Sequence, residues 1–385
     1  MIPFNKPYLS GNEEKYISTA IRNNKISGNG EFTKKCHSLF CQTFGFNKVL
    51  LTTSCTDALE MTALLCNLEK DDEIIVPAYT FVSSALAFIR EKAKIVFADS
   101  SPDHPNIDVD KIEPLISNKT RAIVVVHYAG IAVDMDKVIS LAKQYNLIVI
   151  EDAAHAINSY YKGEPLGSIG DLGAFSFHET KNIQCGEGGL LAINNKRFLQ
   201  RAEILWEKGT NRADFFRGKI DQYNWVDTGS SFLPSEITSA YLLSQLENIS
   251  KIQILRTRLW EQYNTKLKSL EKKGLITLPK IPSYATNNAH IFYLLVDSLL
   301  TRNQLINHLN NNGIHAVFHY IPLHKSPYYL KENNNQDLPN AIMFENRLVR
   351  LPLFAELTAE EVNKITQEIK SYFTTKTKVI SIETT

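Results

Sequence analysis

The stretch NLIVIEDAA, residues 146–154, is an apolar run rich in β-branched residues that ends abruptly in acidic and small residues. Four similar runs precede it, KVLLTT, DEIIVPA, AKIVFAD and TRAIVVVH, at residues 48–53, 72–78, 93–99 and 120–127. Strands buried on both faces have this near-continuous apolar character, which is typical of parallel sheets. Between the runs, segments such as 56–68 and 133–145 repeat apolar residues at the helical period. The pattern predicts an α/β fold, a mainly parallel sheet joined by helical crossovers.

The pattern changes after about Asn248. A long charged helix is expected over 251–270, then sparser strands including NAHIFYLLV at 288–296, and a final helix near 358–372. We therefore expect an N-terminal arm and large domain over 1–248, a smaller α+β domain over 249–373, and a loosely held tail over 374–385. The Asn-rich stretch 332–335 is expected to be a surface loop.

Composition limits the classes of partner. The chain has 385 residues, of which 42 are basic and 41 acidic, so it carries no polycationic surface for nucleic acid or an anionic membrane. No apolar run approaches the roughly 20 residues of a membrane helix, and the first residues lack a signal-peptide order. The five cysteines have no paired CxxC spacing, so neither a metal site nor disulfides are expected. A cytoplasmic enzyme acting on small molecules is the expectation.

Ligands of such sheets bind at the carboxyl ends of the strands. At TTSCTDAL, residues 52–59, a strand ends in hydroxyl residues where a helix begins. Backbone N–H groups there, with the Ser54 and Thr56 hydroxyls, can hold a phosphate. The alternative is a simple helix N-cap. No GxxxxGK[ST] run occurs, so a P-loop is excluded.

Asp152 and His155 follow the strand of residues 146–154 and should both point to the ligand edge. A carboxylate there can pair with a protonated ring nitrogen, and an imidazole can hydrogen-bond a phenolic oxygen of the same ring. The alternative is a capping aspartate beside a histidine with ordinary hydrogen bonds.

Lys181 lies in FSFHETKN, residues 175–182, just before the flexible GEGG at 186–189. Aromatic residues and glycines around it allow the partial desolvation that a Schiff-base lysine needs, although a lone lysine is usually solvated. Phe81, in PAYTFVSSA at 77–85, can stack on a planar ring or belong to the core. HYIPLH, residues 319–324, places Tyr320 and His324 around a proline, as a substrate contact or as a packed turn.

Taken in order, several phrases resemble the DegT/DnrJ/EryC1/StrS family of sugar aminotransferases. They are MIPFNKP, LLTTSCTDALEM, YTFVS, VHYAG, FSFHETKN, GEGG, EKGTNR, FFRG, FHYIPLH and VRLPLF, and the match runs from Pro3 to about Phe373. The resemblance implies the aspartate-aminotransferase-like fold type I of pyridoxal-phosphate (PLP) enzymes, with a large PLP-binding domain and a smaller α+β domain. It also implies pyridoxal 5'-phosphate as cofactor and a homodimer.

By position, the resemblance assigns each residue a role. Lys181 would carry the cofactor, Asp152 would pair with its pyridine nitrogen, and His155 would lie on its phenolic oxygen side. The remaining contacts implied are ring stacking by Phe81, phosphate binding by Cys55, Thr56 and Ser176, binding of the partner subunit's phosphate by Ser231, and sugar or substrate contacts by Tyr320, His324 and Arg212 of the 207–223 loop. Many members have Gly at position 55 and Asn at position 231; Cys55 keeps the backbone N–H, whereas Ser231 is shorter than Asn.

The implied reaction is transamination of dTDP-4-dehydro-6-deoxy-D-glucose with L-glutamate. The product would be the 4-amino-4,6-dideoxy-D-galactose nucleotide, used for a surface polysaccharide such as enterobacterial common antigen or O-antigen. The gluco product from the same substrate is the alternative. A sugar dehydratase of this family would have histidine in place of Lys181, and a non-catalytic nucleotide-binding protein of the same fold would have lost the lysine and aspartate.

Overall fold

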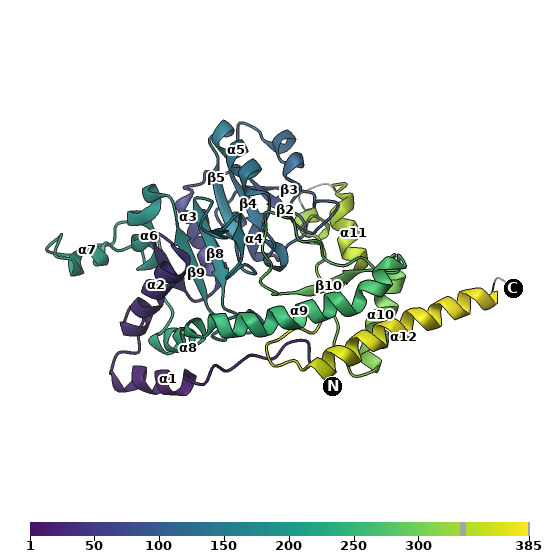
Figure 1. Cartoon of the computed structure of the whole chain (residues 1–385). Coiled ribbons are helices and arrows are strands. Elements are labelled where there is room, and N and C mark those ends of the chain that lie inside the picture. The colour runs from purple at the N-terminus through teal and green to yellow at the C-terminus, as the bar shows by residue number, and fades with distance from the viewer. Residues whose placement is uncertain (332–335, 384–385) are drawn as a thin grey trace.

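A computed structural model describes residues 1–331 and 336–383, with side chains of the last helix described to Thr375. Its centre is a seven-stranded sheet in the order β1-β9-β8-β5-β4-β2-β3 (Figure 1). The strands are β1 (Val49–Thr52), β2 (Glu73–Pro77), β3 (Lys94–Ala98), β4 (Thr120–Val126), β5 (Ile148–Asp152), β8 (Leu172–Ser176) and β9 (Gly189–Ile193). All five strands predicted from apolar runs are therefore present, and the expected α/β class is confirmed.

The strand pairing is mostly parallel, as expected, with one exception. β3, β2, β4, β5 and β8 pair in parallel, whereas β9 runs antiparallel to both β8 and β1. β1 therefore points in the same direction as β8 but reaches the sheet through β9, and not through a parallel neighbour as its run suggested. The carboxyl ends of β1, β2, β4, β5 and β8 consequently all meet at one edge.

Alternating side chains of each strand enter two separate cores. Leu50, Ile74, Val124 and Ile150 belong to the core beneath α3 (Cys55–Leu65), α4 (Ser83–Arg90) and α6 (Leu199–Trp206). Their sequence neighbours belong to the opposite core, which is covered by α2 (Glu31–Phe44), α5 (Met135–Tyr145) and α8 (Glu236–Glu247). Both faces are thus buried, which explains the unbroken apolar runs. α3 and α5 match the predicted helices at 56–68 and 133–145.

Residues beyond the sheet build a smaller helical and β layer. The long α9 (Ile249–Lys272) crosses below the sheet, and β10 (Phe292–Leu295) pairs with β11 (Leu348–Leu351) (Figure 1). These elements share a third core with α10 (Leu299–Asn311) and α12 (Ala359–Glu383), and Ile2 of the N-terminal segment also packs there. The divisions at 248/249 and 373/374 stay predictions. The tail expected at 374–385 coincides with the end of α12, of which the side chains after Thr375 and residues 384–385 lie outside the description, as does the predicted loop 332–335.

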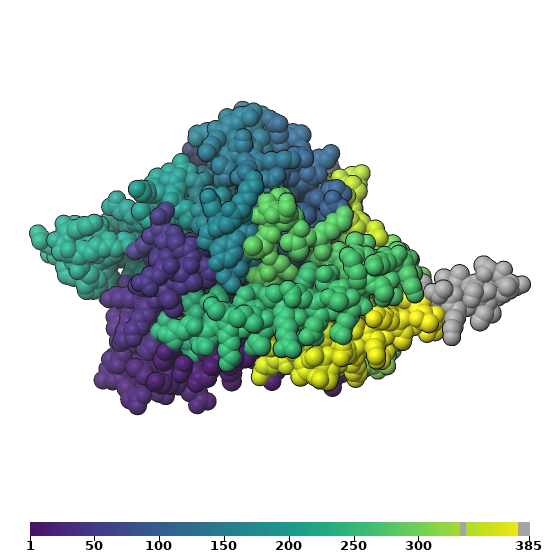
Figure 2. Space-filling view, in the orientation of Figure 1, coloured from purple at the N-terminus to yellow at the C-terminus, as the bar shows by residue number. Residues whose placement is uncertain are grey.

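The remaining elements are short or peripheral: α1 (Glu13–Arg22), α7 (Arg212–Phe216), α11 (Pro339–Arg347), the hairpin β6 (Tyr160–Tyr161) and β7 (Glu164–Pro165), and the 3-10 turns Val109–Lys111, Glu113–Leu115, Tyr128–Gly130, Lys196–Phe198, Leu323–Lys325 and Tyr329–Lys331. α7 stands on a segment that projects away from the body of the molecule (Figures 1 and 2). None of the helices in the described part of the chain combines the length and apolar character that a bilayer crossing requires.

Candidate active site

The first turn of α3 offers unpaired backbone donors at the sheet edge. Ser54 caps this helix, because its hydroxyl accepts the N–H of Asp57 at 3.0 Å and its carbonyl accepts the N–H of Ala58 at 3.2 Å. The N–H groups of Cys55 and Thr56 come before the first intrahelical bond and point out of the helix start. The capping alternative therefore describes Ser54, and anion binding at this turn stays a prediction. Helix starts of this kind attract phosphate.

Close packing places Ser176 near this turn. Gly189 of β9 pairs with Thr52 on one side and with Ser176 on the other. A Cβ on Gly189 would lie 2.3 Å from the Ser54 carbonyl oxygen and 2.5 Å from the Cys55 nitrogen, so only glycine fits between the strands and the helix start. The Thr56 hydroxyl is 2.8 Å from that of Ser83 at the start of α4. Thr52, Ser176 and the start of α3 are thus neighbours around Gly189.

Asp152 ends β5 and is 5% exposed. Its Oδ2 accepts the Ser84 hydroxyl at 2.7 Å, and its Oδ1 accepts the Ala154 N–H at 3.1 Å. Burial raises the pKa of this carboxyl, although the two donors and the nearby Lys181 oppose the shift. Because burial disfavours the ionised carboxylate, a cationic partner such as a protonated ring nitrogen stabilises it strongly.

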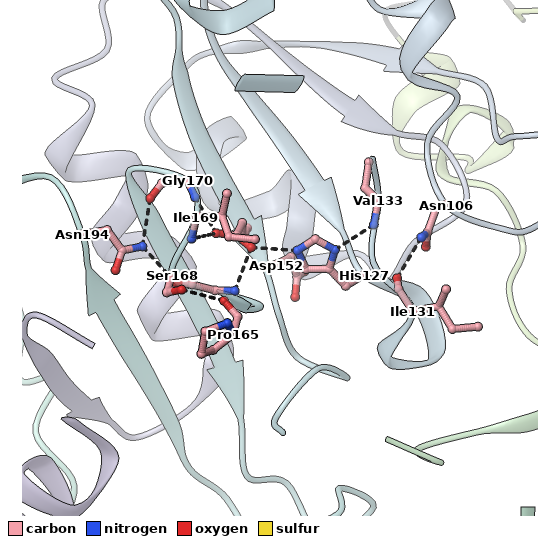
Figure 3. A network of polar contacts seen from close by, with 12 residues as sticks. Asn106, His127, Ile131, Val133, Asp152, Pro165, Ser168, Ile169, Gly170 and Asn194 are labelled. Carbon is pink, nitrogen blue, oxygen red and sulfur yellow. Dashed lines mark hydrogen bonds and ion pairs between the residues drawn. The ribbon is translucent and has the colours of Figure 1, made fainter. Parts of the chain in front are cut away.

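A buried network fixes the strand behind Asp152 (Figure 3). The Glu151 carboxylate accepts the backbone N–H groups of Gly167, Ile169 and Gly170 at 2.6 to 2.7 Å. It also contacts His127 Nε2 at 2.9 Å, while His127 Nδ1 accepts the Val133 N–H at 3.2 Å. With Nδ1 an acceptor, Nε2 carries the proton and donates it to Glu151. This network locks β4 and the 167–170 turn onto β5 and so orients Asp152.

His155 is neutral, and one of its nitrogens is already used. Its burial, together with Lys181 and Arg350, lowers the imidazole pKa well below the ordinary value. Nδ1 accepts the Ala129 N–H at 3.3 Å, which leaves the proton on Nε2. His155 can therefore donate one hydrogen bond to a ligand oxygen, as the prediction requires.

Lys181 sits in the turn that joins β8 to β9. Backbone hydrogen bonds from Lys181 to His178 and from Glu179 to Gly186 hold this turn. Desolvation by burial lowers the pKa of the ammonium group to about 8, with a smaller contribution from Arg350, while Cys55 and Asp152 act in the opposite direction. A substantial fraction of the amine is thus neutral near physiological pH, which is what a nucleophilic lysine needs.

The residue after Lys181 anchors the turn to a distant segment. Asn182 donates to the Asn288 carbonyl at 2.8 Å, and its Oδ1 is 2.9 Å from His290 Nδ1. The His290 ring packs on His155 at a centroid distance of 4.5 Å. Asn288 also donates to the His155 carbonyl at 2.7 Å. No local pattern distinguishes Asn182, whereas the polar start of the 288–296 run is a signal for Asn288 and His290.

Comparisons with known proteins agree with this geometry. The model of the DegT/DnrJ/EryC1/StrS aminotransferase family matches residues 7–370. The chain belongs to this family. It is 30% identical over 378 residues to the spore coat polysaccharide biosynthesis protein SpsC of Bacillus subtilis, covering 96% of both chains.

Solved structures of family-like proteins superpose closely on the chain. The PLP-form of the putative sugar aminotransferase Spr1654 from Streptococcus pneumoniae is 26% identical, with a TM-score of 0.88 and coverage of 96% of this chain and 98% of that one. PseC of Helicobacter pylori, an aminotransferase of pseudoaminic acid biosynthesis, is 26% identical with a TM-score of 0.89, covering 97% and 99%. These likenesses confirm the expected fold type I.

Six of the site residues predicted from the resemblance to the DegT/DnrJ/EryC1/StrS family lie at the same edge of the sheet. Asp152, His155 and Lys181 interact electrostatically, and Cys55 interacts with both Asp152 and Lys181. Thr56 and Ser176 belong to the strand and helix ends around the same edge. Burial keeps the pKa of the Cys55 thiol well above its ordinary value, so its N–H, and not its sulfur, is the group that matters for an anion.

The remaining predicted residues are not part of this group of six. Phe81 is 58% exposed in the loop after β2, so it is not a core residue, and its ring lies 6.3 Å from the ring of Tyr320. His324 is fully buried, with both nitrogens lacking a hydrogen bond to any described residue, and its charged neighbours are Lys325, Asp99 and Glu345. Its sugar-binding role stays a prediction.

Arg212 belongs to the projecting segment, whereas Ser231 directly precedes the buried Phe232, whose carbonyl accepts the Thr53 N–H at 3.0 Å. Ser231 is exposed and forms an isolated bridge with Glu207. Arg212 starts α7, lies 4.0 Å from Glu207 and stacks over Phe216. The predicted roles of both residues stay predictions.

Proposed function

We propose that the protein is a PLP-dependent sugar-nucleotide aminotransferase that uses L-glutamate as amino donor. Its acceptor is dTDP-4-dehydro-6-deoxy-D-glucose, and its product is dTDP-4-amino-4,6-dideoxy-D-galactose, which this cytoplasmic enzyme would supply for a surface polysaccharide. The observation that carries the chemistry is a partly neutral Lys181, with its pKa lowered to about 8, beside a buried Asp152 and a helix start with free N–H groups.

The residues present fit pyridoxal phosphate. The N–H groups of Cys55 and Thr56 at the start of α3 and the hydroxyl of Ser176 suit its phosphate, because Gly189 brings the end of β8 close to this helix start. Asp152 suits the ring nitrogen and the Nε2–H of His155 suits the phenolic oxygen. When bound, this cofactor accepts the electron pair released at the amino-bearing carbon of the substrate.

The protein's own groups move the proton and hold the charge. Lys181 Nζ, neutral in a substantial fraction of molecules, removes the proton from the α-carbon of the donor. Because its turn holds Lys181 at the edge of the sheet, the same nitrogen can deliver that proton to a second carbon nearby. Asp152 stays ionised against the positive ring nitrogen, helped by the Ser84 hydroxyl. His155 donates without becoming charged. Two successive half-reactions on one lysine predict ping-pong kinetics.

A homodimer completes this proposal. Exposed aromatic side chains mark the projecting segment, among them Phe216 and Trp225, and Phe81 is exposed at the sheet edge. Large exposed apolar side chains of this kind indicate an interface. In a dimer, Arg212 and Ser231 would reach the partner's site, while Tyr320 and His324 would contact the sugar from their own subunit.

The test is product analysis. The protein with PLP, L-glutamate and the keto sugar nucleotide should give a product with an axial amine at C4 by proton NMR coupling constants. Lys181→Ala should give none, whereas Lys196→Ala, which removes an exposed lysine, should behave as wild type. An equatorial amine would move the protein to the gluco product. The absence of any amine, with no visible band on adding PLP, would favour a non-catalytic nucleotide-binding protein.

A further inference from the structure

An extended segment of residues 2–12, the strap, precedes α1 and is fixed at both ends (Figure 1). Its first anchor is the smaller layer, where Ile2 pairs with Ile314 and packs into the third core. Its second anchor is α8, where the Ser10 hydroxyl donates to the Ser244 carbonyl at 3.1 Å. Because an extended chain of this kind makes few hydrogen bonds within itself, its order depends on such neighbours.

Between these two anchors the strap contacts the turn that carries Lys181. Asn5 Nδ2 donates to the Glu179 carbonyl at 3.1 Å, and Gln184 Nε2 donates to the Tyr8 carbonyl at 3.3 Å. Glu179 lies two residues before Lys181, and Gln184 lies three residues after it. The two contacts therefore flank the lysine on either side along the chain.

The strap also covers the outer face of this turn. Phe4 and Asn5 line a narrow cleft together with Thr180, the residue directly before Lys181. Burial is the main cause of the lowered pKa of Lys181. A segment that keeps water away from the turn therefore supports the neutral amine.

The strap and the anchor at Asn182 hold the turn at different points. Asn182 donates to the Asn288 carbonyl at 2.8 Å and so ties the turn to the start of the smaller layer. Gln184 is 3% exposed, and its Oε1 accepts the Gly186 N–H at 3.0 Å within the turn. The strap thus reaches the turn through a side chain that also orders its glycine-rich half.

We propose that the strap positions Lys181 from outside the active site, with Asn5 and Gln184 as the positioning residues. This inference rests on the proposed function for the role of Lys181 as the cofactor lysine. The Asn5 contact is exposed, and exposed contacts contribute little to the free energy of unfolding, so its loss tests positioning and not stability. A loosened strap should let water reach the turn and raise the pKa of Lys181.

The experiment compares the apoprotein of wild type with that of Asn5→Ala/Tyr8→Gly, which removes the Asn5 donor and makes the strap flexible without changing the turn. Hydrogen–deuterium exchange of the amides of residues 179–186 should accelerate at least about tenfold. The midpoint of PLP capture against pH should rise at least about half a pH unit above the wild-type value near 8, because a better hydrated ammonium group loses its proton at higher pH. Gln184→Met should change both readouts less in this variant than in the otherwise wild-type chain, since part of its effect passes through the strap.

Lys6→Met and Tyr241→Phe are the matched controls. Lys6 belongs to the strap but pairs with Glu356 of the loop before α12, at 2.9 Å. The Tyr241 hydroxyl of α8 is the second acceptor of Gln184 Nε2, at 2.8 Å, so Tyr241→Phe changes the partners of Gln184 without touching the strap. Both controls should show wild-type exchange and a wild-type midpoint.

Three results would overturn the inference: wild-type exchange and midpoint in Asn5→Ala/Tyr8→Gly, the same changes in either control, or full additivity with Gln184→Met. Both readouts are taken without substrate. A wild type that captures PLP with these strap-dependent changes but makes no amino sugar would therefore refute the proposed function and leave the role of the strap standing.

Discussion

Removing the Ser84 hydroxyl should weaken the cofactor site through Asp152. Ser84 is fully buried in the first turn of α4, and its hydroxyl donates to Asp152 Oδ2 at 2.7 Å. In Ser84→Ala the carboxylate keeps only the Ala154 N–H as a donor, at 3.1 Å. Burial already raises the pKa of Asp152, and the lost donor raises it further, because that donor stabilises the ionised form.

The size of the effect follows from one hydrogen bond to a charged group. Such a bond contributes about 1.5–3 kcal/mol, which corresponds to roughly 10- to 100-fold in cofactor affinity. A protonated Asp152 cannot pair with a cationic ring nitrogen, so affinity falls as pH falls through the pKa. In Ser84→Ala this fall should begin at a higher pH than in wild type. Fluorescence titration of the apoprotein with PLP at several pH values measures both changes.

Thr62→Ala is the control for loss of a buried hydroxyl. Thr62 is also fully buried, but its hydroxyl donates to the Leu59 carbonyl within α3. It should bind PLP with the wild-type pH profile. Equal affinity and an unshifted acidic limb in Ser84→Ala would refute the role given to Ser84 and, with it, the placement of Asp152 against the ring nitrogen.

Three further predictions address the lysine, the phosphate turn and the turn anchor. Capture of PLP by the apoprotein should accelerate as pH rises through about 8, since the nucleophile is the neutral Lys181 amine, and stopped-flow absorbance showing a midpoint near 10.5 would contradict this. Gly189→Ala should lower PLP affinity at least about tenfold and destabilise the fold by roughly 1–3 kcal/mol, because its Cβ would meet backbone atoms of Ser54 and Cys55; wild-type affinity and denaturant midpoint would contradict the close contact. Asn182→Ala leaves His290 Nδ1 without its partner and should cost about 1–3 kcal/mol in chemical denaturation and lower kcat, whereas unchanged kcat would show that the anchor does not position Lys181.

The sequence predicted the sheet well because burial on both faces leaves a strong signal. Residues 148–150 of β5, IVI, are apolar at every position, and Asp152 at the end of the strand lies at the ligand edge. β9 was not predicted, since GLLAI follows a glycine-rich turn that indicates flexibility. Its glycine is needed for the contact with Ser54 and not for flexibility.

Residues from the smaller layer escaped prediction for a different reason. Arg350 stands between Val349 and Leu351, so strand alternation predicts a solvent-facing side chain. Only the tertiary fold turns that face toward His319 and the active site. Ser84 and Asn182 were missed likewise, because their partners Asp152 and Asn288 are far away along the chain. Long-range pairs leave no local pattern.

The most direct test of the account is to locate the covalent bond to the cofactor. The purified protein would be loaded with PLP, reduced with borohydride and digested, and the peptides sequenced by mass spectrometry. The account predicts a phosphopyridoxyl group on the peptide of residues 175–182 at Lys181, absent in Lys181→Ala. A label on another lysine, or no label after a visible band has formed, would contradict it.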